Sequence, residues 1–171
     1  MPEENAVILV IDMLKGFLEK GNLFCGEDAR KIIPQVVELL KSCQREKIFF
    51  ICDNHDENDK EFQMFPPHCI KGTEESKIID ELSFFKGEII PKTRYSGFFK
   101  TSLEERLSEI KPDKVVVVGV CTNICVLHTV ADLRNRDYNV EVPEKAVASF
   151  DQEAHTFALK HIEKILGATI I

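Results

Sequence analysis

Short apolar segments alternate with segments of helical periodicity along the whole sequence, and this alternation limits the possible folds more than any other feature. Successive strand, helix and strand form βαβ units, whose strands run parallel in one sheet. Six strands are predicted, at residues 6–11, 47–52, 88–90, 114–118, 138–142 and 168–171. Helices are predicted at residues 28–44, 74–82, 102–110, 123–135 and 152–165. We therefore expect an α/β doubly wound fold, with a mostly parallel six-stranded sheet and helices on both faces.

The length and charge of the chain limit the classes of protein to which it can belong. A chain of 171 residues, 44% of them hydrophobic, is expected to form a single domain over residues 1–171. The formal net charge is −7 and no long run of Lys and Arg occurs, which argues against a nucleic-acid partner. The N-terminal segment is acidic, and its apolar run stops at Asp12. We expect a cytoplasmic protein without a membrane partner, with its six cysteines as free thiols.

Chemically active side chains follow several of the predicted strands. Asp12, Asp53 and Lys92 come directly after or near strand ends, and a turn containing Cys121 follows another. Each alone has an ordinary explanation, as a turn residue, a solvated lysine or a core thiol. In an open parallel sheet, however, ligands bind at the carboxyl ends of the strands. The occurrence of all these side chains at the same edge of the sheet therefore indicates a functional site.

The cysteine at the start of the fourth predicted helix is suited to be a nucleophile. We expect Thr122 or Asn123 to cap that helix, which places Cys125 in its first turn. The helix dipole and nearby Lys92 are expected to lower the pKa of the Cys125 thiol. Asp12 could accept the thiol proton and later give it to a leaving amine. The backbone N–H groups of the same turn could receive an oxyanion.

A polar loop at about residues 53–73 predicts a metal site. A mixture of nitrogen and oxygen donors suits zinc, iron or manganese. The candidate ligands are two carboxylates and two imidazoles, Asp53, His55, Glu61 and His68. Asp56, Glu57 and Asp59 stand close enough in sequence to leave the choice of carboxylate open.

Four segments resemble the isochorismatase-like cysteine hydrolases, and the resemblance extends over nearly the whole chain. They are VILVIDMLKGF at 7–17, KTRYSGFFKT at 92–101, GVCTNICV at 119–126 and AVASFDQEAHTFAL at 146–159. The resemblance implies a catalytic triad of Asp12, Lys92 and Cys125. It also implies a cis peptide bond between Val120 and Cys121, and an oxyanion hole formed by the backbone N–H groups of Cys121 and Cys125.

The loop is similar to the metal segment of the nicotinamidase branch of that family, through DNH at 53–55 and FPPHCIKGT at 65–73. The branch more often carries His as its third ligand, where this chain has Glu61. Leu14 and Phe65 replace the Gln and Trp common there. The resemblance implies one divalent transition metal, with zinc favoured over iron or manganese, and Phe17 and Phe65 flanking the substrate ring.

The implied activity is hydrolysis of nicotinamide, or a close aromatic carboxamide, to the acid and ammonia through a thioester on Cys125. Such a reaction belongs to NAD salvage, and a homo-oligomer is expected from the resemblance. Two alternatives stay open. One is a hydrolase of another small amide or a vinyl ether, and the other is a non-catalytic metal-binding module that kept the fold.

Overall fold

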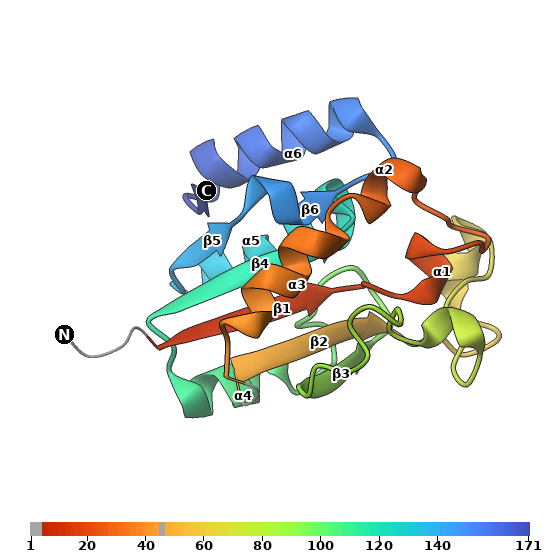
Figure 1. Cartoon of the computed structure of the whole chain (residues 1–171), viewed down its shortest axis with the longest axis horizontal. Coiled ribbons are helices and arrows are strands. Elements are labelled where there is room, and N and C mark those ends of the chain that lie inside the picture. The colour runs from red at the N-terminus through yellow and green to blue at the C-terminus, as the bar shows by residue number, and fades with distance from the viewer. Residues whose placement is uncertain (1–4, 45–46) are drawn as a thin grey trace.

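The computed structural model describes residues 5–44 and 47–171 and consists of a parallel sheet flanked by helices (Figure 1). The sheet order is β3-β2-β1-β4-β5-β7. The strands along this path are β1 (Ala6–Ile11), β2 (Ile48–Asp53), β3 (Glu88–Lys92), β4 (Lys114–Val120), β5 (Val140–Val142) and β7 (Thr169–Ile170). A seventh strand that the sequence did not predict, β6 (Val147–Ala148), pairs with the end of β4. The predicted α/β class is confirmed.

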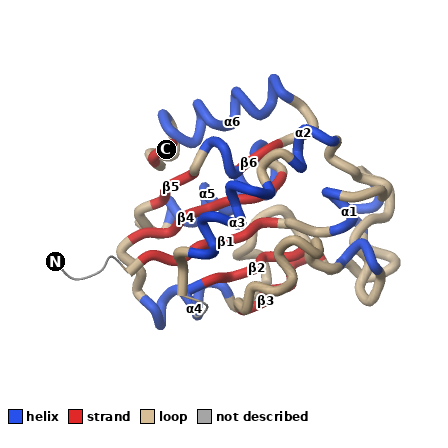
Figure 2. Tube along the Cα trace, viewed as in Figure 1, coloured by secondary structure: helices blue, strands red, loops and turns tan. Residues whose placement is uncertain are grey.

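Helices cover both faces of the sheet, as expected (Figure 2). They are α1 (Lys15–Leu18), α2 (Glu27–Arg30), α3 (Ile33–Lys41), α4 (Leu103–Ile110), α5 (Leu127–Asn135) and α6 (Gln152–Lys164). Alternate β1 residues point to opposite cores. Val10 joins the core that contains Val36 of α3, whereas Leu9 joins the core that contains Val130 of α5. No helix among the described residues is long and apolar enough to cross a membrane.

The predicted helix at 28–44 is two helices, because the chain breaks between α2 and α3. Pro34 lies in the first turn of α3, where its missing N–H costs no hydrogen bond. The predicted helix at 74–82 is wrong. Only the 3₁₀ turn η3 (Glu74–Ser76) forms there, and the backbone beyond it bonds to the segment after β1 instead. Lys15 N donates to Lys77 O at 2.9 Å, and Ile79 N donates to Met13 O at 3.1 Å.

The strand order changes direction in the middle of the sheet, between β1 and β4. From β1 the chain proceeds outward through β2 and β3 on one side, and through β4, β5 and β7 on the other. Because the helical connections leave to opposite faces, a crevice is expected at the carboxyl ends of β1 and β4. Asp12 follows β1, and the turn that carries Cys125 follows β4.

Candidate active site

Asp12, Lys92 and Cys125 meet at this crevice. Lys92, the last residue of β3, is the register partner of Asp53 on β2. Its Nζ lies 2.9 Å from Asp12 Oδ2 and 3.5 Å from Cys125 Sγ, and it also donates to Asp53 Oδ1. Asp12 Oδ1 accepts a hydrogen bond from Asp53 N at 2.8 Å. All four side chains are buried, so the ammonium group is enclosed by two carboxylates and a thiol.

The backbone at the end of β4 brings the cysteine turn close to Asp12. Gly119 adopts a φ of +116°, and a Cβ atom built there would lie 2.0 Å from Ile11 O. Only glycine permits this approach of β4 to β1. The peptide bond between Val120 and Cys121 is cis, as the resemblance implied. The π-helical turn η4 (Thr122–Val126) then carries Cys125.

The capping prediction for this turn is wrong, because both candidate side chains bond elsewhere. Thr122 Oγ1 is 2.8 Å from His155 Nδ1, and Asn123 Oδ1 accepts from Ser149 Oγ at 2.6 Å. Thr122 is fully buried, and His155 lies in the first half of α6. These two contacts tie the cysteine turn to α6 and to the segment before it.

Burial controls the protonation of Asp12 and Cys125. It raises the pKa of the Cys125 thiol well above the ordinary value, and nearby Lys92 opposes this only in part. The prediction of a lowered thiol pKa is therefore wrong, since the depth of burial outweighs the ammonium group. Burial and the charge of Asp53 likewise raise the pKa of Asp12 to about 6, although Lys92 lowers it.

These shifts suit Asp12 to be a proton acceptor. At neutral pH the thiol is protonated, whereas Asp12 is mostly ionised. The Asp12 carboxylate interacts with the Cys125 thiol, and its Oδ2 is paired with Lys92 Nζ at 2.9 Å. Burial lowers the pKa of Lys92, but Asp12 and Asp53 outweigh it and raise that pKa well above its ordinary value. Lys92 therefore stays charged at neutral pH.

The four predicted metal ligands come together beside this triad. One donor atom from each of Asp53, His55, Glu61 and His68 lies within 4.8 Å of all the others. Glu61 Oε2 is 3.3 Å from His55 Nε2 and 3.2 Å from His68 Nε2. Asp53 Oδ2 is 3.4 Å and 3.6 Å from the same two nitrogens. All four residues are buried.

The chemistry of this cluster fits a cation. His55 Nε2 is buried and makes no hydrogen bond with the described residues, although two carboxylates face it. Burial lowers the pKa of His68, but hydrogen bonds with Asp53 and Glu61 outweigh it and raise that pKa to about 10. The cluster thus attracts positive charge to the point where its donor atoms converge. Two carboxylates and two imidazoles are donors that zinc, iron and manganese accept.

The polar loop at about residues 53–73 has more internal structure than its sequence indicated. His55 and Ile70 form a parallel bridge, in which His55 N donates to Cys69 O at 3.0 Å and Lys71 N to His55 O at 2.8 Å. This bridge brings His68 back beside His55. A 3₁₀ helix, η2 (Lys60–Gln63), holds Glu61 near its start.

The structure also shows which carboxylates belong to the cluster, a choice that the sequence left open. Asp56 and Glu57 are exposed, and neither belongs to the group of converging donor atoms. Asp59 Oδ2 lies 3.0 Å from Nδ1 of His55, the ring nitrogen that faces away from the other ligands. The convergent carboxylates are therefore those of Asp53 and Glu61.

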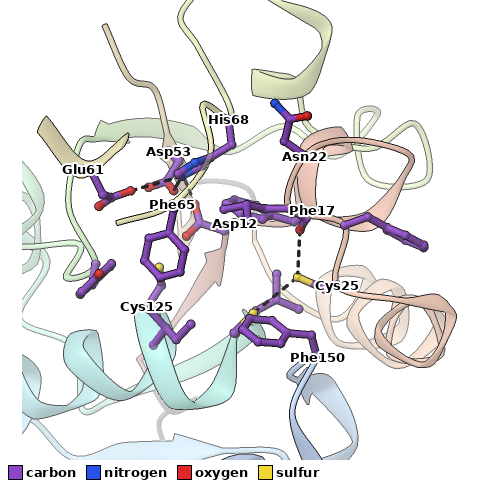
Figure 3. Close-up of a pocket in the computed structure, with 16 residues that line it drawn as sticks. Asp12, Phe17, Asn22, Cys25, Asp53, Glu61, Phe65, His68, Cys125 and Phe150 are labelled. Carbon is purple, nitrogen blue, oxygen red and sulfur yellow. Dashed lines mark hydrogen bonds and ion pairs between the residues drawn. The ribbon is translucent and has the colours of Figure 1, made fainter. Parts of the chain in front are cut away.

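A cavity of about 220 Å³ is lined by Asp12 and Cys125 and by three residues of the metal-type cluster, Asp53, Glu61 and His68 (Figure 3). The predicted ring-binding residues Phe17 and Phe65 both line it, and their ring centroids are 5.7 Å and 6.4 Å from that of His68. Sequence reasoning missed several other lining residues, among them Asn22, Cys25, Tyr95, Ile124 and Phe150. Tyr95, Ile124 and Phe150 carried a signal, because they lie in the segments KTRYSGFFKT, GVCTNICV and AVASFDQEAHTFAL, whereas Asn22 and Cys25 carried none.

The sequence and fold of this chain are similar to those of known proteins. The isochorismatase domain model matches residues 6–171. The chain belongs to the isochorismatase family. It is 39% identical to the uncharacterised isochorismatase family protein PncA of Bacillus subtilis (strain 168), over 95% of this chain and 97% of that protein.

Solved structures agree with this family assignment. The pyrazinamidase/nicotinamidase of Streptococcus mutans UA159 superimposes with a TM-score of 0.91 at 39% identity, covering 97% of this chain and 99% of that one. The pyrazinamidase of Pyrococcus horikoshii, solved in complex with zinc, has a TM-score of 0.88 at 28% identity and covers 98% of both chains. This isochorismatase-family hydrolase thus shares its fold with solved pyrazinamidases and nicotinamidases.

Proposed function

We propose that this protein is a nicotinamidase-type amidohydrolase, which converts nicotinamide or a close aromatic carboxamide to the acid and ammonia. One observation carries the proposal. A thiol, a buried base and a metal-type cluster face a single cavity whose wall includes the aromatic rings of Phe17, Phe65 and Tyr95. A volume of about 220 Å³ suits a small ring better than an extended substrate.

The reaction begins with transfer of a proton. As Cys125 Sγ attacks the carboxamide carbon, Asp12 accepts the thiol proton and Lys92 remains charged beside both. Lys92 prevents a thiolate and a carboxylate from facing one another without a counter-ion. In this proposal the backbone N–H groups of Cys121 and Cys125 stabilise the oxyanion, a contribution of about 3–4 kcal/mol per donor in other enzymes.

Collapse of the tetrahedral intermediate breaks the carbon–nitrogen bond. Asp12 returns its proton to the amine, ammonia leaves, and the acyl group stays on Cys125 as a thioester. A water molecule, deprotonated by Asp12, then attacks the thioester carbon and releases the acid with a regenerated thiol. Dividing the hydrolysis in this way replaces one difficult step by two easier ones.

Asp53, His55, Glu61 and His68 would hold one divalent cation at the far end of the cavity. When bound, the ion supplies a Lewis acid with open positions for water or a ring nitrogen. Zinc is the first candidate, since the Pyrococcus horikoshii relative was solved with it. The carboxylates of Asp53 and Glu61 would balance its charge, and the aromatic side chains would exclude bulk water from the cavity.

Ammonia release from nicotinamide tests the proposal. Benzamide, which lacks the ring nitrogen, is the matched substrate control, and the Cys125→Ala variant is the enzyme control. We expect turnover of nicotinamide that exceeds that of benzamide and is lost in the variant. No ammonia from either amide, with zinc, iron and manganese each supplied in turn, would refute the proposal.

A further inference from the structure

Asp59 contacts two members of the metal-type cluster without belonging to it. Its Oδ2 lies 3.0 Å from His55 Nδ1, and its Oδ1 accepts a hydrogen bond from Glu61 N at 2.8 Å. Arg94 Nη1 donates to the same Oδ1 at 2.8 Å. The Asp59 side chain is only 8% exposed, so these contacts are shielded from solvent. One carboxylate therefore touches the ring of one candidate ligand and the backbone of another.

The contact with His55 determines how that ring can bind a cation. An imidazole coordinates through one nitrogen when the proton resides on the other. A carboxylate beside Nδ1 holds the proton there, which leaves the lone pair on Nε2, the atom that faces Asp53 and Glu61. It also fixes the rotation of the ring about its long axis.

The second imidazole is held differently. His68 Nδ1 lies 2.8 Å from the backbone oxygen of Pro66, so the main chain itself fixes its tautomer. Among the described residues, His55 is thus the cluster imidazole whose orientation depends on a replaceable side chain. This asymmetry makes the contribution of Asp59 measurable.

Arg94 connects this arrangement to the catalytic lysine. Its guanidinium group pairs with Asp59, while its backbone oxygen accepts a hydrogen bond from Lys92 Nζ at 3.0 Å. The Arg94 side chain is 39% exposed, whereas that of Lys92 is fully buried. A three-residue segment at the end of β3 therefore contacts both the triad and the carboxylate that holds His55.

We propose that Asp59, held in place by Arg94, is a positioning residue that orients His55 and the start of η2 for cation binding. The inference rests on the cation site of the proposed function and deepens it. Asp59 is not itself a ligand, because its contact is with the outward nitrogen of His55 and its backbone contact is with Glu61 N. It acts through its neighbours, by reducing the number of ring orientations and tautomers that the cation must select.

The test is the zinc dissociation constant, measured by competition with a chromophoric chelator. We expect Asp59→Ala to weaken zinc binding by about 10–100-fold, the usual effect of losing such an outer partner. Asp59→Asn keeps one acceptor oxygen, so its zinc dissociation constant is expected to lie between those of Asp59→Ala and the unmodified protein. Asp56→Asn is the matched control, since it removes an equal charge from an exposed position in the same loop. We expect it to change the constant by less than about 2-fold, as an exposed charge is screened.

A second variant and a spectroscopic measurement guard against a general loss of folding. Arg94→Gln removes the partner of Asp59 at a partly exposed position and is expected to weaken zinc binding less than Asp59→Ala does. Nitrogen-15 NMR of the zinc-loaded protein should show His55 protonated at Nδ1, and in Asp59→Ala that proton should exchange faster with water. A merely structural role for Asp59 would leave the His55 signal unchanged in molecules that remain folded.

The outcomes separate this inference from the proposed function. Zinc binding that depends on Asp59, in a protein that releases no ammonia, would support the positioning role and refute the amidase. Zinc affinity that is equal in Asp59→Ala and the unmodified protein would overturn the positioning role, whatever the activity. An equal loss of zinc affinity in Asp56→Asn would also overturn the positioning role, because the net charge of the loop would then explain the effect. Absence of zinc binding in the unmodified protein would overturn it as well.

Discussion

Replacement of Lys92 by methionine should destabilise the protein in a manner that depends on pH. The substitution keeps the length of the side chain but removes the ammonium group between Asp12 and Asp53. Removing one partner of a buried ion pair typically costs about 3–5 kcal/mol, because the other charge stays buried and uncompensated. Here two carboxylates lose their counter-ion, so we expect the upper part of that range at pH 8.

The cost should decrease as the pH falls, because Asp12 can take up a proton. With Lys92 present, the pKa of Asp12 is already raised to about 6, and without Lys92 it should rise further. A raised pKa means that the folded state holds more protons than the unfolded state. The stability from this proton is therefore present below the unfolded pKa of about 4 and lost as pH rises through the folded pKa. Each further unit by which the pKa of Asp12 rises is equivalent to about 1.4 kcal/mol. The loss of unfolding free energy in Lys92→Met should therefore be clearly smaller at pH 5.5 than at pH 8.

Urea unfolding of both proteins, followed by circular dichroism at pH 5.5 and pH 8, measures this difference. Lys15→Met serves as the control, because Lys15 pairs with the mostly exposed Asp80 near the surface. Its effect should be small and nearly independent of pH. An equal loss of stability at both pH values for Lys92→Met would contradict the account of the enclosed ammonium group.

Two further predictions concern the carboxylates. Glu61→His should retain the metal and bind nicotinamide more tightly, because a neutral imidazole leaves the cation more positive, whereas Glu61→Ala should weaken metal binding. Metal dissociation constants and Michaelis constants of both variants measure this, and unchanged metal affinity in Glu61→Ala would show that Glu61 is not a ligand. The value of kcat/KM should fall as pH decreases through about 6, because protonated Asp12 cannot accept the thiol proton. A pH–rate profile that stays flat down to pH 4.5 would exclude Asp12 as the base.

The sequence was sufficient to locate the site because its residues follow strands. Asp12, Asp53 and Lys92 stand at or beside the ends of predicted strands, and the carboxyl ends of parallel strands lie at one edge of the sheet. Their proximity in space then follows from the fold class alone. The strand assignments were reliable because β1 and β4 are nearly continuous apolar runs.

Features that depend on contacts between distant segments were not predictable. The periodicity of residues 74–82 indicates a helix, yet their backbone groups bond to residues after β1. Thr122 is a good capping residue by type, but His155 competes for its hydroxyl from 33 positions away. The thiol pKa of Cys125 depends on burial, which sequence spacing does not give. The choice between Glu61 and Asp59 required the orientation of the His55 ring.

Covalent labelling by an electrophilic analogue of nicotinamide is the most direct test that Cys125 attacks the substrate. Mass spectrometry of the digested protein should find the label on Cys125, in the unmodified chain and in Cys121→Ala. Cys121→Ala should also keep substantial ammonia release, because in this account Cys121 contributes its backbone N–H and not its thiol. Cys125→Ala should take up no label and release no ammonia. A label found on Cys121 alone, or turnover that survives Cys125→Ala, would contradict the account.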